Sequence, residues 1–285
     1  MTEKIAILVD SGSDVPQAVV DANDNIRIVP LTVTIEGQDY QDRVNLTPDE
    51  FYTRLQTVSA LPLTASPAPE QVTTAVQGLL DEGFTKILGI TISSGLSATH
   101  QTFRLAAEQF DSDQVVMLDT KSVGIGSGLQ AVYASELINQ GHSFETVVAK
   151  VTASIAKSHV YFYIPTLKYL RAGGRIGRVS GLVGSALKIK PVISCDPEGI
   201  YYPITKSRSE NKAVAKMVAL VAGDFAGQRG RIAVAHGQNP ALLAQVSAAL
   251  QEQTGHAVDY QGDISPSLGV HTGPGLIGVG VQIEA

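Results

Sequence analysis

The alternation of strand-like and helix-like runs over the first two-thirds of the chain constrains the fold more than any other feature. The runs alternate at residues 4–10, 15–23, 26–35, 47–57, 69–83, 86–92, 97–110, 114–120 and 128–141. Strands separated by helices predict a parallel sheet with helices on both of its faces. One helix also carries its own start signal, because Thr47 is followed three residues later by Glu50, a capping-box pattern.

The pattern changes from Phe162 onward and predicts a second domain. This part offers a helix start, a Gly/Arg-rich turn, a further short helix near residues 178–190, a hairpin around Pro197–Gly199, a long helix at 210–225, a strand at 231–237 and a glycine-rich final strand. A chain of 285 residues also exceeds the size at which one core keeps growing. We therefore predict a two-domain α/β protein, with a parallel-sheet α/β domain over 1–165 and an α+β domain over 166–285.

Composition narrows the classes of partner and location. The net charge is −6 and basic and acidic residues are interspersed, which argues against nucleic acid or an anionic membrane as the main partner. Cys195 is the single cysteine, so it forms no internal disulfide, and we expect a small core residue near a strand end. No apolar run approaches the roughly 20 residues of a membrane span, and the first residues lack a signal-peptide layout. These features predict a cytoplasmic protein with no integral membrane segment.

Several short motifs do not carry function here. The segment Gly273–Gly278 reads G-x-G-x-x-G, but no helix can follow it and no acidic residue lies about twenty positions further on, so it does not predict a dinucleotide site. The sequence contains no Walker A pattern and no G-x-S-x-G elbow. No spacing of His, Cys and carboxylate residues suggests a metal site. We therefore predict neither catalytic residues nor a metal.

Four hydroxyl- and glycine-rich segments stand where predicted strands end. They are VDSGSD at 9–14, TASPAP at 64–69, ISSGLS at 92–97 and LDTKSVGIGSG at 118–128. Ligands of parallel α/β sheets bind beyond the carboxyl ends of the strands. Loops favour Ser, Thr and Gly in any case, but four such segments together favour one shared site.

The turn ISSGLS is the best candidate within that site. Ser93 and Ser94 end a strand, and Gly95, Leu96 and Ser97 begin a helix. A helix start presents unpaired N–H groups and the positive end of a dipole, so the added hydroxyls predict a small anion cradle. Because repeated glycines and a lysine are missing, a single carboxylate or phosphate head group suits it better than a polyphosphate. The alternative is a plain helix cap at Ser97 with solvated neighbours.

At this point the sequence resembles a known family. Its ordered motifs are VDSGSDVP, TASPAP, ISSGLSATHQTF, LDTKSVGIGSG, LKYLRAGGRIG, SRSENKA and VHTGPGLIGVGV, which together span nearly the whole chain. This series is similar to the DegV family, the fatty-acid-binding proteins that serve as the FakB component of bacterial fatty acid kinase. The resemblance implies a DegV-like two-domain fold with the ligand between the domains.

The resemblance also implies the ligand and its site. One fatty acid, such as palmitate, stearate or oleate, would lie with its acyl chain in a buried tunnel, and no other cofactor is implied. Thr64 and Ser94 would hydrogen-bond the carboxylate, and His271 would complete the network with a raised pKa. The implied ligand-binding set is Thr64, Ser93, Ser94, Gly95, Leu96, Ser97, His271 and Arg171.

The implied partner is an ATP-dependent fatty acid kinase, which would phosphorylate the bound acid to an acyl-phosphate. Arg175 and Arg208 would face that partner, unless they are ordinary surface charge. The chain itself would be no enzyme. Two departures stand out, since Ala65 and Ser66 replace the serine and glutamine of the usual T-S-Q-P loop and Ala98 replaces a glycine. The first departure removes two polar side chains that would support the residues around the head group in the family.

Two other functions stay open on the sequence. The chain could bind a different amphiphilic carboxylate, such as a retinoid or a prenyl acid. It could also be a serine-dependent acyl hydrolase with Ser94 or Ser97 as nucleophile and His271 as base. The missing nucleophile elbow and the lack of an identified acid to orient the histidine argue against the hydrolase.

Overall fold

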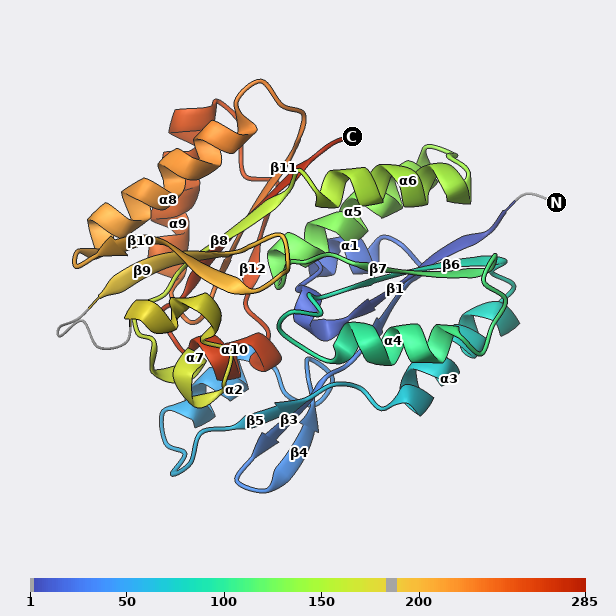
Figure 1. The fold of residues 1–285 in the computed structure, drawn as a ribbon, viewed down its shortest axis with the longest axis horizontal. Coiled ribbons are helices and arrows are strands. Elements are labelled where there is room, and N and C mark those ends of the chain that lie inside the picture. Colours follow the sequence, from blue (N-terminus) through green and yellow to red (C-terminus); the bar gives the residue numbers. More distant parts are fainter. Residues whose placement is uncertain (1–2, 183–188) are drawn as a thin grey trace.

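A four-stranded parallel sheet forms the first half of the fold (Figure 1). The computed structural model describes residues 3–182 and 189–285. The sheet order is β2 (Ile26–Val29), β1 (Ile5–Asp10), β6 (Lys86–Thr91) and β7 (Val115–Asp119), and all three pairings are parallel. The alternation in the sequence is therefore confirmed as a parallel sheet. The predicted run at 26–35 divides at Pro30, because β3 (Thr32–Ile35) leaves to join another sheet.

Helices cover both faces of this sheet, as predicted. α3 (Pro69–Asp81) and α4 (Thr99–Ala107) pack on one face, and α1 (Gln17–Asp21) and α5 (Ile125–Asn139) pack on the other. Twelve of the fifteen residues of α5 are buried. A helix buried on nearly all sides must be covered by a second layer as well as by the first sheet.

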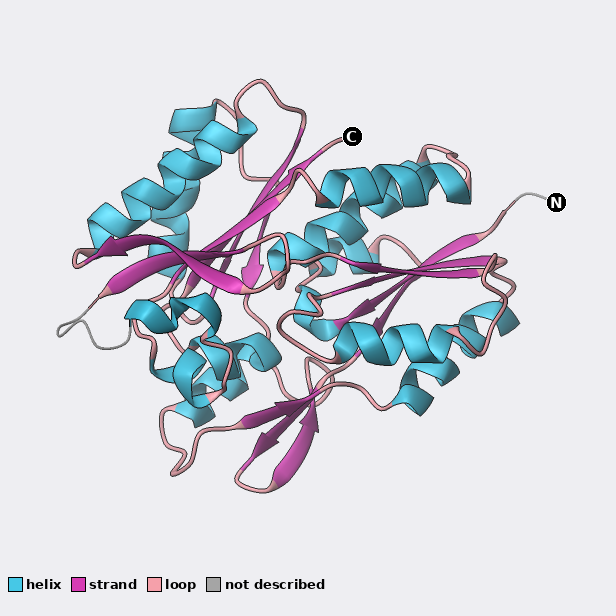
Figure 2. Ribbon diagram, viewed as in Figure 1, coloured by secondary structure: helices cyan, strands magenta, loops and turns pink. Residues whose placement is uncertain are grey.

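That second layer is a six-stranded mixed sheet (Figure 2). Its order is β10 (Tyr201–Ser207), β9 (Lys190–Cys195), β8 (His159–Tyr163), β13 (Ile277–Ile283), β11 (Gly230–His236) and β12 (Tyr260–Asp263). α8 (Glu210–Phe225) and α9 (Pro240–Thr254) cover its outer face. β8 lies before the predicted domain boundary at residue 165 and pairs with β13 and β9 of this sheet.

Close contact between α5 and β13 joins the two halves. A Cβ atom added at Gly280 of β13 would lie 3.2 Å from the backbone nitrogen of Gly126 in α5. A side chain at that position would push the helix off the sheet, so the glycine-rich final strand is what lets the two layers meet.

A small third unit closes the lower side of Figure 1. It contains the antiparallel sheet of β4 (Gln38–Gln41), β3 and β5 (Leu63–Ala65), with α2 (Pro48–Leu55), α7 (Lys168–Ala172) and α10 (Pro266–Thr272) beside it. The capping box at Thr47 and Glu50 is confirmed at the start of α2. The first two residues of the TASPAP segment, Thr64 and Ala65, belong to β5, and residues 66–68 connect it to α3.

The remaining elements are one α-helix and two 3₁₀ helices. α6 (Phe144–Ile155) packs beside α5, and the 3₁₀ helices are η1 (Ser11–Ser13) and η2 (Gly177–Leu182). The short helix predicted near residues 178–190 coincides with η2 at its start, and its continuation over 183–188 lies outside the described residues. Within the described part of the chain, no helix combines the length and apolarity that crossing a membrane requires.

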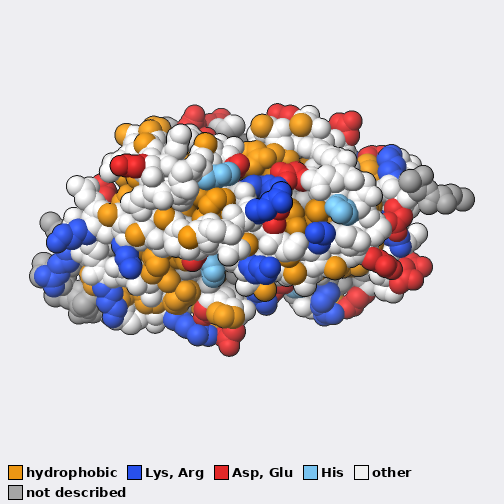
Figure 3. Space-filling model, turned by 90° about the horizontal axis from the view of Figure 1, so that it is seen from above, with side chains coloured by type: hydrophobic (Ala, Val, Ile, Leu, Met, Phe, Trp, Pro, Cys, Tyr) orange, Lys and Arg blue, Asp and Glu red, His pale blue; other side chains and the backbone are white. Residues whose placement is uncertain are grey.

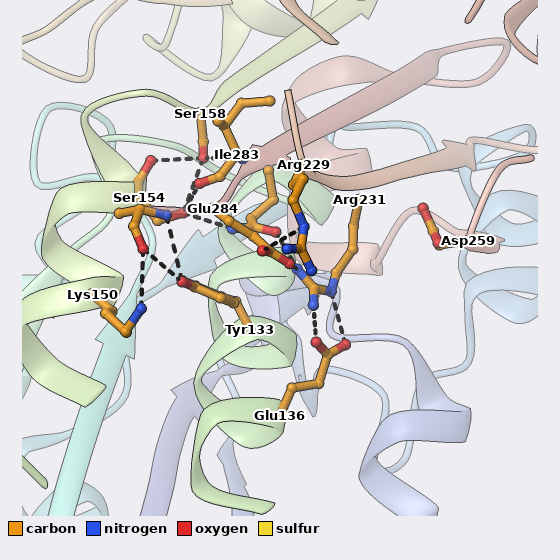
Figure 4. Close-up of polar contacts among 12 residues, drawn as sticks. Tyr133, Glu136, Lys150, Ser154, Ser158, Arg229, Arg231, Asp259, Ile283 and Glu284 are labelled. Carbon is orange, nitrogen blue, oxygen red and sulfur yellow. Dashed lines mark hydrogen bonds and ion pairs between the residues drawn. The ribbon is translucent and has the colours of Figure 1, made fainter. Parts of the chain in front are cut away.

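A polar network beside the contact of α5 with β13 connects the parallel-sheet half of the fold to the mixed-sheet half (Figure 4). Arg231 on β11 forms an ion pair with Glu136 on α5 and another, at 3.3 Å, with Glu284 after β13. Its Nη1 donates to Oε1 of Gln282 at 2.7 Å, and its guanidinium lies 5.3 Å from the ring centre of Tyr133. The Arg231 side chain is only 13% exposed, so its partners replace the water that it has lost.

We expect Arg231→Met to lower the free energy of unfolding by about 2 kcal/mol, because it leaves Glu136 and Gln282 without their partner. Urea denaturation monitored by circular dichroism measures the change. Arg229→Met is the matched control, since the Arg229 side chain is 89% exposed and reaches Glu284 only at 3.7 Å. Equal midpoints for the two variants would show that the network adds no stability.

Candidate functional site

The four hydroxyl-rich segments meet at one narrow cavity, which we call the central cavity. Its accessible volume is about 40 Å³. Gly12, Thr64, Ser97 and Val123 each come from a different one of the four predicted segments, and all line it. The rest of its wall consists of Leu31, Ile92, Leu96, Arg175, Tyr201, Ser267, Leu268 and His271.

Four polar residues of the wall form a cluster, and the rest of the wall is mainly apolar. Oγ1 of Thr64 on β5 lies 2.7 Å from Nε2 of His271 on α10, although 207 residues separate them in the chain. Arg175 follows α7 and is close enough to His271 to affect its titration. Ser97 precedes α4, and its Oγ lies 2.8 Å from Oγ1 of Thr99. We call Thr64, Ser97, Arg175 and His271 the polar group.

Arg175 is fixed in place by backbone carbonyls. Its Nε donates to the oxygen of Leu96 at 3.3 Å, and its Nη1 donates to the oxygen of Gly173 at 2.8 Å. The sequence predicted that Arg175 faces a partner and that Arg171 binds the ligand. In the structure Arg175 lines the central cavity, and Arg171 is exposed on α7.

The two serines of the turn after β6 point elsewhere. Ser93 is buried, and its Oγ donates to the oxygen of Gly199 at 2.8 Å. Ser94 is exposed, and its Oγ accepts from Nζ of Lys121 at 2.9 Å while its backbone nitrogen donates to Asp119. Neither serine lines the central cavity, whereas Ser97 of the same turn does. Lys121 and Asp119, which lie 27 and 25 residues further along the chain, hold Ser94 outward.

The VDSGSD segment supports the wall from behind. Oδ2 of Asp10 accepts from the nitrogen of Ile92 at 2.8 Å, and Oγ of Ser11 accepts from the nitrogen of Leu31 at 3.0 Å. Oδ1 of Asp14 accepts from the nitrogen of Ser265 at 3.0 Å, just before α10. Burial raises the pKa of Asp10 to about 7 and that of Asp14 to about 6. Only Gly12 of this segment reaches the cavity, so the segment positions the wall.

Two further cavities adjoin the polar group. The serine-side cavity, about 310 Å³, is lined by Ser94, Gly95, Leu96, Ser97, Ala98, Gly174, Arg175, Gly177 and Ile200. The leucine-side cavity, about 230 Å³, is lined by Leu61, Pro62, Leu63, Thr64, Ala172, Gly173, Arg175, Val270 and His271. Arg175 belongs to all three cavities, so the polar group lies where they meet.

His271 is neutral in this structure, in contrast to the expected raised pKa. Burial, and then the nearby Arg175 guanidinium, lower the pKa of His271 to about 4. The sequence argument assumed a carboxylate beside the ring, and the protein itself supplies none there among the described residues. A neutral ring whose Nε2 donates to Thr64 leaves the Thr64 hydroxyl free to donate to an incoming anion.

We expect a pH dependence of stability from this histidine. Its pKa is lower in the folded protein than the ordinary 6.5, so this group alone binds more protons in the unfolded chain between about pH 4 and 6.5, and its own contribution to the free energy of unfolding rises with pH across that window. Asp10 and Asp14, whose pKa values are raised by burial, contribute with the opposite sign. His271→Gln should remove the rising contribution, so the free energy of unfolding of the variant should rise less, or fall more, with pH than that of the unmodified protein. Denaturation at several pH values with the ligand-free protein measures it, and identical slopes for both proteins would contradict the assignment.

The sequence did not identify most of the apolar wall. Leu31, Tyr201 and Leu268 are buried hydrophobic residues, and the sequence offers no signal that separates a cavity wall from an ordinary core. Gly12, Ile92, Leu96 and Val123 lie in segments that it did single out. Among the described residues, no group of three or more His, Cys, Asp or Glu side chains has the geometry to hold a metal ion.

Comparisons with known proteins agree over the whole chain. A family model described as an uncharacterised protein of the DegV family matches residues 4–284. A DegV domain-containing protein of Clostridium acetobutylicum is 35% identical over 277 residues, which cover 97% of this chain and 98% of that protein.

Solved structures of similar proteins also align over nearly the whole chain. A fatty-acid-binding DegV family protein from Thermus thermophilus aligns with a TM-score of 0.88 and 30% identity, over 98% of this chain and 99% of that one. A stearic-acid-binding protein from Eubacterium ventriosum aligns with a TM-score of 0.89 and 25% identity, over 98% of each chain. The predicted fold class is confirmed by these alignments.

Proposed function

The chain belongs to the DegV family, and from this premise we propose that it binds one long-chain fatty acid in the central cavity. The carboxylate would lie against Thr64, Ser97, Arg175 and His271. The acyl chain would lie along the apolar wall. The observation that carries the proposal is this division of one narrow cavity into a polar group and an apolar remainder.

Because the central cavity measures only about 40 Å³, the side chains of its wall would move apart to take a whole acyl chain, and burial of that chain supplies free energy for this. Burial of each methylene contributes about 0.8 kcal/mol, so a sixteen-carbon chain gains about 11 kcal/mol before the costs of ordering. The head group therefore needs to orient the ligand more than to hold it. Arg175 supplies the positive charge, and the hydroxyl groups of Thr64 and Ser97 supply directional donors.

The same geometry argues against a serine hydrolase. Nε2 of His271 contacts Thr64 rather than Ser94 or Ser97, and its Nδ1 has no hydrogen-bond partner among the described residues. A base that activates a serine hydroxyl needs that hydroxyl within reach and a group to orient the ring. We therefore propose a binding protein that presents its ligand to an ATP-dependent fatty acid kinase, as the family resemblance implies.

Titration of delipidated protein with oleate and with methyl oleate tests the binding proposal. The two ligands share an acyl chain, but only oleate carries the negative charge that Arg175 and its neighbours would hold. We expect saturable binding of oleate and clearly weaker binding of the ester. Retinoic acid and farnesoic acid serve as competitors, and tighter binding of either would assign the cavity to a different amphiphilic carboxylate.

Arg208 is the candidate contact with the kinase. It is exposed, it directly precedes the N-cap residue of α8, and Lys206, Lys212 and Lys216 nearby are also exposed. Figure 3 shows basic side chains spread over the lower left of the molecule, on the lobe that carries the mixed sheet. Cations on an otherwise acidic protein favour encounter with an anionic surface.

We expect Arg208→Ala to leave oleate binding unchanged but to lower acyl-phosphate formation with the kinase at least about tenfold, the equivalent of roughly 1.4 kcal/mol. The measurement pairs bound lipid with kinase turnover for the same preparation. Arg229→Ala is the control, because this exposed arginine follows the other end of α8, a helix of sixteen residues and so about 24 Å long. Unchanged turnover would identify Arg208 as solvated charge, and lost lipid would assign it to the site.

A further inference from the structure

The two cavities that flank the polar group differ in chemistry. Apart from the residues of the polar group, the leucine-side cavity is lined by Leu61, Pro62, Leu63, Ala172, Gly173 and Val270. The Leu63 side of this cavity is open, since Leu63 is 68% exposed and is one of the few large hydrophobic residues at the surface of the described chain. The path from the surface through the leucine-side cavity to the polar group is therefore mainly apolar.

The serine-side cavity has the opposite character. Apart from Leu96, Ile200 and the exposed Ala98, its wall consists of serines, glycines and Arg175. Nζ of Lys121 donates to Oγ of Ser94 at 2.9 Å and forms an ion pair with Asp119 at 2.7 Å, so Arg175 is the cation of this cavity that no carboxylate pairs among the contacts described above. The hydroxyl of Ser97 and the guanidinium of Arg175 line both this cavity and the central cavity. An anion that extends out of the central cavity past these two residues would therefore stay among polar groups.

We propose that the serine-side cavity receives the phosphoryl group when the bound fatty acid is converted to its acyl-phosphate. This inference rests on the proposed function, because it requires a fatty acid in the central cavity. In the transfer step, a lone pair of a carboxylate oxygen forms the new O–P bond to the terminal phosphorus of a nucleoside triphosphate. The bond from that phosphorus to its bridging oxygen breaks, and the electron pair leaves with the nucleoside diphosphate.

The charge of the product favours this cavity over its neighbour. The phosphoryl group of an acyl-phosphate, like that of a phosphate monoester, carries a charge of about −1.5 to −2 at neutral pH and three acceptor oxygens. Both cavities share Arg175, and the leucine-side cavity also carries Thr64 and His271, but the rest of its wall offers only apolar groups such as Leu61, Leu63 and Val270, which would not replace the lost hydration. In the serine-side cavity the hydroxyl groups of Ser94 and Ser97 lie in the same wall as Arg175. The outward position of Ser94 thereby acquires a role, although Ser94 is absent from the wall of the central cavity.

A stable analogue tests the proposal without a kinase. The probe is a β-ketophosphonate with a palmitoyl chain, in which a methylene replaces the bridging oxygen of the acyl-phosphate, and palmitate is the reference ligand. Ala98 and Ala172 make a matched pair of variants, because both are exposed and each lines only one of the two flanking cavities. Substitution by phenylalanine fills the serine-side cavity in A98F and the leucine-side cavity in A172F.

We expect A98F to weaken phosphonate binding at least about tenfold, or roughly 1.4 kcal/mol, while palmitate binding stays near that of the unmodified protein. A172F should leave the ratio of the two affinities unchanged. A ratio that falls only in A172F, or in neither variant, would overturn the proposal, as would a protein that binds palmitate but not the phosphonate. Failure to bind palmitate at all would instead refute the proposed function. Retained palmitate binding also shows that each variant is folded.

Discussion

Val123→Phe lowers the affinity for oleate at least about a hundredfold in this account, because the larger ring fills part of the central cavity. Val123 is 4% exposed and lines the cavity from the turn between β7 and α5. A ring that displaces four methylenes removes about 3 kcal/mol of burial, which corresponds to more than two orders of magnitude in affinity. The loss should depend on chain length, since a short acid does not use the whole apolar wall.

A series of acids from octanoate to stearate measures the effect. The affinity of the unmodified protein should rise steadily with chain length, and that of Val123→Phe should level off. Val123→Ala is the control, because it enlarges the same part of the cavity and leaves the polar group untouched. Parallel curves for Val123→Phe and the unmodified protein would place the acyl chain outside the central cavity.

The second large effect concerns the carboxylate. Arg175→Leu combined with Thr64→Val should weaken oleate binding by about 1.5 to 3 kcal/mol for each hydrogen bond to the charged group that is lost, and should leave methyl oleate nearly unaffected. Arg175 is the more informative of the two residues, since the sequence assigned it to a partner surface and the structure places it in the cavity wall. An equal loss for the ester would mean that the variants disturb the fold rather than the head group.

Ser94 and Ser97 provide a matched test within one turn. Both are serines before α4, but only Ser97 lines the central cavity, whereas Ser94 contacts Lys121. Ser97→Ala should weaken oleate binding by about tenfold, the effect of one charged hydrogen bond, and Ser94→Ala should not. The reverse result would restore the assignment that the resemblance implied.

The sequence identified the segments of the site but not the direction of their side chains. Thr64 and His271 were singled out on motifs, and the structure joins them by a contact of 2.7 Å. The choice between Ser94 and Ser97 depends on Asp119 and Lys121, which come from the turn after another strand. Such a contact between distant segments leaves no trace in the local pattern of residues.

The fold shows the same limit. The parallel sheet was predictable because each strand and helix has its own periodicity. The place of β8 was not, because its sequence is compatible with either sheet and only its pairing with β13 and β9 decides. Likewise Arg171 and Arg175 belong to one motif, and their different directions follow from the turn at Gly173 and Gly174 that ends α7.

Mass spectrometry of an organic extract of the purified protein tests the central claim most directly. The account predicts one long-chain fatty acid per chain for the unmodified protein, and a marked loss of that lipid for Val123→Phe prepared in the same way. An extract without fatty acid, from a protein that also fails to take up labelled oleate, would contradict the assignment of the central cavity.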